Sequence, residues 1–242
     1  MFTLHNSCPY IIWAGIQSSA GHDMIGNGGF QLNPGQSTEI QAPTNWSGRF
    51  WPRRDCSFDQ TGRGTCQTGD CGGVLNCVGA GGSPPVTLAE FTLNSPVDYY
   101  NVSLVDGYNV PMSIVPVGYR PRSSSCQTVR CESDLNWICP SDLQVLNHAG
   151  EVVACKSACM AFNTPEFCCT GEYASPEKCR PTAYSKVFKN ACPASYSYAY
   201  DDPTSIFMCR GANYLITFCW WWICSQCSES FIWWTIKQMM YY

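Results

Sequence analysis

Apolar residues come in short runs that alternate with polar ones, and Gly, Pro or Asn interrupts these runs about every eight to twelve residues. The pattern is typical of antiparallel β-sandwiches and barrels, because a half-buried strand needs an apolar residue at every second position. We therefore expect a mainly β fold, an antiparallel β-sandwich of short strands. The expected strands are 2–4, 10–13, 48–51, 86–93, 102–105 and 214–218.

Two other segments depart from this pattern. Around 56–84 glycine is frequent and large aliphatic residues are scarce, which predicts a small cross-linked ribbon rather than a core. A cysteine-rich stretch, 126–179, predicts a lobe that several disulfides cross-link to separate partner segments. Residues 152–162 show helical spacing, and 183–190 is a shorter candidate helix. The sandwich would then consist of residues 1–55, 85–125 and 180–219.

The last segment, 220–242, differs in composition from the rest of the chain. It contains five of the nine tryptophans and also Cys224 and Cys227, and it lacks turn residues. Polar residues from Ser225 to Ser230 interrupt it, so it lacks the run of about 20 apolar residues that a transmembrane helix needs. We expect no transmembrane segment and a disordered or loosely collapsed tail. A membrane-surface or partner-binding tail is the alternative.

Cysteine usage indicates the compartment. The chain has 18 cysteines in 242 residues, together with 20 Gly and 16 Pro, which suits a loop-rich chain restrained by disulfides. Disulfides persist in oxidising compartments, so we expect a secreted, extracellular protein. The sequons at Asn45 and Asn101 are candidate glycosylation sites. No signal peptide is visible before Cys8, so we expect a mature chain that carries an initiator methionine.

Net charge excludes two classes of partner. Fourteen basic against eighteen acidic residues give a net charge of −4, with a sequence pI of about 5.3. Nucleic-acid binding needs a basic footprint, so we expect no nucleic-acid partner. Electrostatic attraction to anionic membranes is not expected either.

Metal sites and common catalytic motifs find little support. His5, His22 and His148 are the only imidazoles, and the only Cys-x-x-Cys pair is Cys224 and Cys227 in the atypical tail. Structural zinc sites usually need two paired ligand clusters. No Gly-x-Ser-x-Gly elbow, P-loop or dinucleotide glycine pattern occurs. We expect no metal and no cofactor.

Two carboxylates are the remaining candidates for chemistry. Strand alternation places Glu90 on the same face as Leu88 and Thr92. Asp106 stands just before Gly107, where a turn begins. If their strands are neighbours, both carboxylates line one concave surface. The alternative is that both are solvated charges at strand edges.

One segment carries a specific resemblance. Residues 62–77 read GRGTCQTGDCGGVLNC and resemble the signature of the thaumatin family at every defined position. The resemblance spans residues 2–219, and we identify the chain as a member of the larger, acidic, plant pathogenesis-related type. Further similar segments are NSCPY at 6–10, RFW at 49–51, TLAE at 87–90, SLVDGYN at 103–109, FCC at 167–169 and ASYSY at 194–198.

The resemblance implies eight disulfides, because the family has sixteen cysteines and this chain has sixteen up to Cys219. Carried over in order, they are Cys8–Cys219, Cys56–Cys66, Cys71–Cys77, Cys126–Cys209, Cys131–Cys192, Cys139–Cys155, Cys159–Cys168 and Cys169–Cys179. This pairing agrees with a separate expectation that the adjacent Cys168 and Cys169 have different partners. Resistance to heat, acid and proteases is expected to follow.

The resemblance also implies a cleft between the sandwich and the lobe. In antifungal members one Arg, one Glu and three Asp line it. The matching positions here are Arg49, Glu90, Asn101, Asp106 and Asp201. Asn101 departs from the pattern, which weakens the acidic field, and a glycan on it would obstruct the cleft.

The implied function is defence by binding β-1,3-glucan of fungal walls, as a monomer in the apoplast. Tyr99, Tyr100 and Tyr108 are near Asp106 in sequence and could face sugar rings, although we expect at least two of them to pack in the sandwich. One alternative is a weak endo-β-1,3-glucanase, with Glu90 as general acid and Asp106 as nucleophile or base. A second is inhibition of microbial glycosidases such as xylanases.

Overall fold

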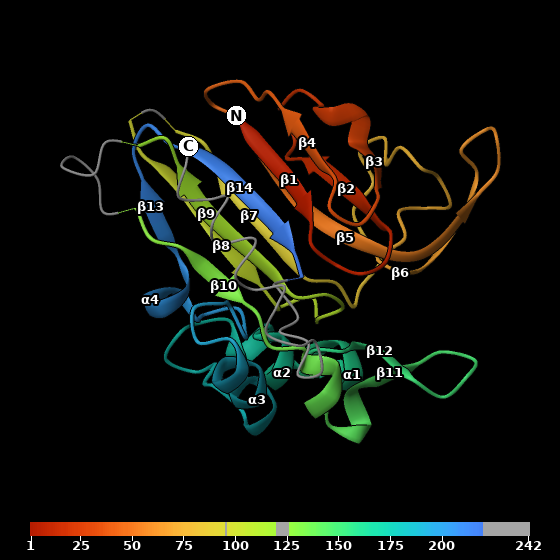
Figure 1. Ribbon diagram of the computed structural model, residues 1–242. Coiled ribbons are helices and arrows are strands. Elements are labelled where there is room, and N and C mark those ends of the chain that lie inside the picture. Colours follow the sequence, from red (N-terminus) through yellow and green to blue (C-terminus); the bar gives the residue numbers. More distant parts are fainter. Residues whose placement is uncertain (95, 120–125, 220–242) are drawn as a thin grey trace, which may run out of the picture.

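The computed structural model describes residues 1–94, 96–119 and 126–219 (Figure 1). The tail 220–242, with Cys224 and Cys227, lies outside the described residues. The strands are β1 Phe2–Asn6, β2 Ile12–Ser18, β3 Gly29–Leu32, β4 Ser37–Ile40, β5 Ser47–Phe58, β6 Gly64–Thr68, β7 Leu88–Thr92, β8 Asp98–Ser103, β9 Met112–Val117, β10 Val129–Cys131, β11 Gln144–Leu146, β12 Val152–Cys155, β13 Phe207–Cys209 and β14 Asn213–Phe218. The helices are η1 Gly26–Gly28, η2 Leu135–Ile138, η3 Ser141–Leu143, α1 Ala158–Phe162, α2 Pro165–Cys168, η4 Gly171–Tyr173, α3 Ala183–Ala191 and α4 Asp202–Ser205.

Two sheets form the sandwich, which confirms the expected mainly β fold. One sheet has the order β10-β9-β14-β1-β4, and the other has β13-β8-β7-β5-β2-β3 with β6 paired to β5. All these pairings are antiparallel except that of β1 with β14. Figure 1 shows β1, β9 and β14 lying across β5, β7 and β8.

Aromatic side chains fill the space between the sheets. Phe2 of β1 is fully buried, and its ring centroid lies 4.8 Å from that of Phe50 on β5 and 4.7 Å from that of Phe91 on β7. Tyr214 of β14 also contacts Phe91, at 5.0 Å. Edge-to-face contacts of this kind stabilise a core beyond the area they bury. These contacts fix the positions of β5 and β7 in the second sheet, whose other face points away from the core.

Two expected strands are displaced along the chain. The segment expected at 10–13 is strand β2 from Ile12 onward, and the one expected at 102–105 is β8, which ends at Ser103. Residues 98–100 of β8 pair with β13, a strand more than 100 residues away. Apolar spacing alone could not locate these limits, because a strand ends where its partners end.

The ribbon packs on the outer face of the second sheet and forms a small core of its own. Trp51 and Leu88 of the sheet pack there with Cys71, Cys77 and Val86. The segment that lacks large aliphatic residues is therefore held by an indole and a disulfide. A fully buried cation, Arg53, lies in the same region.

The lobe 126–179 contains the β11–β12 hairpin and helices α1 and α2, at the foot of the sandwich in Figure 1. Helix α3, in the 180–219 segment expected in the sandwich, lies beside the lobe in the same view. The expectation of a helix over 152–162 was wrong in its first half, because residues 152–155 are β12 and pair with β11. Helix α1 begins only after Ser157, whose hydroxyl accepts a hydrogen bond from the amide of Met160. Valines at 152 and 153 suit a strand better than a helix. The helix expected at 183–190 is α3.

All eight implied disulfides are formed. Cys8–Cys219 spans a sequence separation of 211 residues and joins the segment after β1, the first strand, to the residue after β14, the last strand. Cys168 and Cys169 have different partners, as expected. The remaining bridges are Cys56–Cys66, Cys71–Cys77, Cys126–Cys209, Cys131–Cys192 and Cys139–Cys155.

Candidate functional site

Three polar residues form a row across the middle of the second sheet. In the antiparallel register Arg49 of β5 lies opposite Glu90 of β7, and Glu90 lies opposite Asn101 of β8. Residues that alternate with them, such as Phe50 and Phe91, are buried in the sandwich core. Because successive side chains of a strand point to opposite faces, the row faces away from the core.

Glu90 is the central member of the row. Its Oε2 accepts a hydrogen bond from Asn101 Nδ2 at 3.3 Å. Burial raises the pKa of the Glu90 carboxyl, the nearby Arg49 guanidinium lowers it, and the charge of Asp106 raises it again. The net effect is a raised pKa, because partial desolvation outweighs the single cation.

Asp106 approaches the row from the turn that follows β8. Its Oδ2 lies 4.0 Å from Arg49 Nη1, and the two side chains are 44% and 41% exposed. Gly107 has φ +85°, a conformation that favours glycine, and it lets the chain turn immediately after Asp106. The Asp106 carbonyl accepts a hydrogen bond from the amide of Val86 at 2.9 Å. The backbone therefore fixes Asp106 beside Arg49, while the exposed ion pair itself adds little stability.

Asp201 is held by structural partners. Its Oδ2 accepts hydrogen bonds from the Ser197 amide at 3.0 Å and the Ser197 hydroxyl at 2.8 Å. Lys189 of α3 lies 3.0 Å from the same oxygen, and the Asp201 side chain is only 12% exposed. The carboxylate thus joins the 197–205 segment to α3, and little of it is left for a ligand.

Tyr196 is a buried residue beside Asp202 and the end of β8. Burial raises the pKa of its phenol, and so do its hydrogen bond to Asp202 and the charges of Asp202, Glu90 and Asp201. Its backbone pairs with Ser103 at the end of β8. Among the described residues, no hydrogen bond or ion pair joins Asp201 to Arg49, Glu90, Asn101 or Asp106.

The row lines a hollow of about 250 Å³. Asp106 lines a second, smaller hollow of about 110 Å³ that extends into the lobe. The linings of the two hollows share no residue. The Arg49–Asp106 ion pair joins a residue of the first hollow to a residue of the second. The first hollow is lined by Ser19, Ser47, Gly48, Arg49, Glu90, Phe91, Thr92, Tyr99, Tyr100, Asn101 and Ile206.

The three tyrosines divide as expected, with two in the sandwich. Tyr100 and Tyr108 are buried, and burial raises the pKa of Tyr100 to about 12. Tyr99 is 39% exposed and lines the hollow beside the row. It is the tyrosine of this group that can present its ring to a ligand.

Sequence reasoning missed several residues around the site. Arg180 and Tyr198 line the second hollow, and Ile206 lines the first. Lys189 positions Asp201. Each belongs to a segment that reaches the site through tertiary packing, so no local pattern pointed to it.

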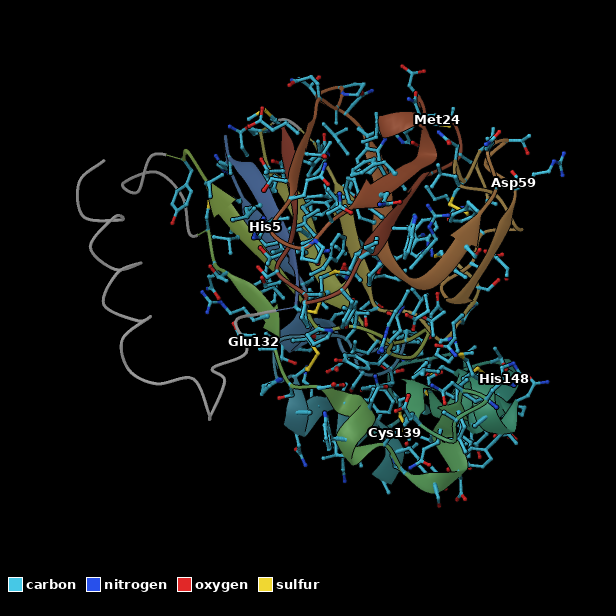
Figure 2. The ribbon with its side chains drawn as sticks, turned by 45° about the vertical axis from the view of Figure 1, so that its right-hand side comes forward. His5, Met24, Asp59, Glu132, Cys139 and His148 are labelled. Carbon is cyan, nitrogen blue, oxygen red and sulfur yellow. A yellow bond between two sulfur atoms is a disulfide. The ribbon has the colours of Figure 1, made fainter. Side chains whose placement is uncertain are left out.

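Metal binding has no candidate site among the described residues. No group of three or more His, Cys, Asp or Glu side chains there could hold a metal ion. Figure 2 shows His5 on the sandwich and His148 in the lobe, far apart. No helix within the described ranges is long and apolar enough to cross a membrane.

Comparisons with known proteins agree with this architecture. The model of the thaumatin family matches residues 6–220. The chain is 58% identical over 219 residues to "Pathogenesis-related thaumatin-like protein 3.5" of Cryptomeria japonica, covering 90% of this chain and 89% of that one. It is 57% identical to "Pathogenesis-related protein 5" of Arabidopsis thaliana, covering 90% and 89%. A Prunus avium protein named "Glucan endo-1,3-beta-glucosidase" is 47% identical, with 88% of each chain covered.

Two solved structures resemble the fold at low sequence identity. A laminaripentaose-producing β-1,3-glucanase in complex with laminaritetraose aligns with a TM-score of 0.57 and 12% identity, covering 90% of this chain and 98% of that one. The thaumatin-like xylanase inhibitor TLXI aligns with a TM-score of 0.51 and 22% identity, with the same shares covered.

Proposed function

The chain belongs to the thaumatin family, and we propose that it is a defence protein whose Glu90 hollow binds β-1,3-glucan of fungal cell walls. The observation that carries this proposal is the row of Arg49, Glu90 and Asn101 across β5, β7 and β8, with Asp106 beside it. The sequence alone could not establish that these side chains meet.

A neutral glucan needs hydrogen-bond partners for its hydroxyls rather than net charge. Carboxylates accept strongly from hydroxyl groups, and Glu90 and Asp106 supply two of them. Arg49 supplies donors that can reach ring and hydroxyl oxygens. Tyr99 adds an exposed ring against which the apolar face of a sugar can pack. The Glu90 hollow and the adjoining Asp106 therefore offer acceptors, a donor and an apolar surface close together.

Retention on insoluble β-1,3-glucan tests the binding proposal. We expect the wild-type protein to be retained, and Glu90→Ala and Asp106→Ala to be retained less. A matched control is Glu39→Ala, which removes an exposed carboxylate from β4 of the other sheet. Retention that does not change in either site variant would refute the proposal.

Hydrolysis of the same glucan is a second candidate function. Glu90 is partly buried and its pKa is raised, as a general acid requires, and Asp106 is the second carboxylate nearby. Glu90 would protonate the leaving glycosidic oxygen, while Asp106 would act as nucleophile or base. The similarity to a relative named as an endo-1,3-β-glucosidase supports considering this reaction.

Release of reducing sugar from soluble β-1,3-glucan tests this second function. Activity that is lost in Glu90→Gln while the variant stays folded would support it. No release at high protein concentration would eliminate it. Loss of xylanase activity on addition of the protein is a separate assay for inhibition, which stays a prediction because the likeness to a xylanase inhibitor reaches only the fold.

Eight disulfides and pathogenesis-related relatives support an extracellular location, and we propose secretion to the apoplast. We further propose that the protein acts as a monomer. Size-exclusion chromatography of secreted material tests both the assembly state and the export of the folded chain.

A further inference from the structure

A broad groove lies between the sandwich and the lobe, away from the two hollows described above. Its volume is about 540 Å³, within the usual range of small-molecule sites, and its lining shares no residue with either hollow. The loop before β2, the strand β5, the helix η2 and the hairpin β11–β12 contribute to it. The residues that carry the argument are Tyr10, Arg54, Asp134, Asn136, Trp137 and Glu151.

Trp137 provides an apolar wall. It is 79% exposed, which is unusual for so large an apolar side chain, while its neighbour in η2, Leu135, is fully buried and anchors the helix. Asp134 caps η2 by accepting a hydrogen bond from the Asn136 amide at 3.1 Å. The indole is thus held on a fixed backbone at the edge of a groove. An indole at the edge of a groove offers a flat apolar face against which a ligand ring can pack.

On the sandwich side of the groove, Arg54 of β5 has N–H groups that can donate to a ligand. The Arg54 guanidinium lies 4.6 Å above the ring of Tyr10. Arg54 Nε lies 3.0 Å from Asp55 Oδ2, but it is buried and has no aligned hydrogen-bond partner among the described residues. The stacking on Tyr10 fixes the plane of the guanidinium, and its Nη groups have no hydrogen-bond partner among the described residues, so they can donate to a ligand.

The floor of the groove offers acceptors. Asn136 Nδ2 donates to the carbonyl of Asn109 at 3.2 Å, and its Oδ1 is buried without a partner among the described residues. A buried polar atom without a partner is costly, so Asn136 Oδ1 is well placed to accept from a ligand. The carboxylates of Asp134 and Glu151 add further acceptors along the groove.

This chemistry selects a ligand class. A cationic ligand would be repelled by Arg54, and an anionic ligand would be repelled by Asp134 and Glu151. A neutral molecule with several hydroxyls and a flat apolar face satisfies all these groups together. We propose that this groove, the Trp137 groove, binds a neutral oligosaccharide, whose ring packs on Trp137 and whose hydroxyls donate to Asn136 and accept from Arg54.

The Trp137 groove is independent of the Glu90 hollow. One long polysaccharide could then engage two sites on one molecule, or two chains could be linked by it. Two linked sites bind more tightly than either alone when the geometry permits both to be filled. The groove would therefore increase retention on an insoluble wall even if each site is weak for short sugars.

A nuclear magnetic resonance titration of the full chain tests the proposal. The probes are three neutral tetrasaccharides, built of β-1,3-linked glucose, β-1,4-linked glucose and β-1,4-linked N-acetylglucosamine, each added to about 10 mM. The indole N–H signal of Trp137 is identified from its loss in Trp137→Phe. We expect at least one sugar to shift this signal and the Asn136 amide in a saturable manner.

Variants then locate the site. Measured at the Asn136 amide, Trp137→Ala should weaken binding of that sugar by about tenfold or more. Ile138→Ala is the matched control, because Ile138 is 53% exposed in the same helix but does not line the groove, and it should bind normally. Glu90→Gln should also leave this titration unchanged, which separates the groove from the function proposed for the hollow.

Three results would overturn the proposal. In the first, none of the sugars shifts the Trp137 signal. In the second, Trp137→Ala binds as tightly as the wild type. In the third, Glu90→Gln abolishes the Trp137 shift, since the ligand would then occupy the hollow.

Discussion

Asn101 donates a hydrogen bond to Glu90 across the β7–β8 ladder, with 3.3 Å between Nδ2 and Oε2. The family pattern has an aspartate at this position, and two carboxylates directly opposite each other would repel. The asparagine replaces that repulsion with a donor that favours the ionised form of Glu90. This substitution therefore reduces the charge of the row while it orders its central carboxylate.

The titration of Glu90 is the first prediction. We expect the pKa of Glu90 to lie above its usual value of 4.5, because burial outweighs the attraction of Arg49. Arg49→Ala and Asn101→Asp should raise the pKa further, whereas Asp106→Asn should lower it. The pKa of Glu90 in the wild type and the three variants is measured from the chemical shift of its side-chain carboxyl carbon as a function of pH. A wild-type midpoint at or below 4.5, or shifts of opposite sign, would contradict the electrostatics described here.

The second prediction concerns stability against pH. A raised pKa in the folded state means that the unfolded chain loses the Glu90 proton first as pH rises from 4.5. Stability from this group is therefore full at low pH, falls as pH rises toward the folded pKa, and is constant above it. Glu90→Gln removes this loss. In urea unfolding, the stability of the variant relative to the wild type should increase as pH rises above 4.5, until Glu90 is ionised in the folded protein. A difference in the free energy of unfolding that stays constant with pH would refute this.

Arg53 supplies the third prediction. Its side chain is fully buried and donates to the carbonyls of Ala14, Val74 and Leu75, and to the sulfur of Cys71. Burial lowers its pKa to about 10, and the charge of Asp70 opposes that shift. The guanidinium therefore remains charged at neutral pH while it ties the ribbon to the sheet.

Arg53→Met would leave those carbonyls unpaired, so we expect a loss of about 3 kcal/mol or more in the free energy of unfolding. The corresponding fall in Tm is roughly 6–12 °C. Arg63→Met is the matched control, since Arg63 is an exposed arginine within the same ribbon. Equal Tm values for the two variants would show that the buried hydrogen bonds contribute nothing.

Glycosylation is the fourth prediction. Asn45 is exposed in a turn before β5, whereas Asn101 is half-buried within β8 and its amide nitrogen is bonded to Glu90. A glycan on Asn101 would have to leave through the hollow and break that bond. We expect intact-mass measurement of secreted protein to show one N-glycan that is lost in Asn45→Gln. The same glycan should persist in Asn101→Gln, and loss there instead would reverse the assignment.

Much of the fold could be predicted because alternation is a local property. The runs that contain Phe2, Phe50, Phe91 and Tyr214 alternate clearly, and each lies in a core strand. The 152–162 segment was misjudged because helical spacing of a few apolar residues also occurs in a strand followed by a capped turn. The disulfide partners came from the family resemblance, since spacing of cysteines along a chain leaves their pairing open.

The site could be predicted only in part. The parity of Glu90 within its strand follows from the sequence, but its position opposite Arg49 and Asn101 depends on the register of β5, β7 and β8. Register is set by the whole sheet. Arg53 and Trp137 were missed for a similar reason. A charge in an apolar strand and a tryptophan in a short helix gain meaning only from the distant segments around them.

The most direct test of glucan binding at the row follows the side-chain amide of Asn101 during titration with a soluble β-1,3-linked glucose oligosaccharide. The signals are identified from their loss in Asn101→Asp. We predict a saturable shift, with binding weakened about tenfold or more in Glu90→Gln and unchanged in the control Glu39→Gln. Asn101 signals that stay constant at every sugar concentration, or equal affinities in both variants, would contradict the account.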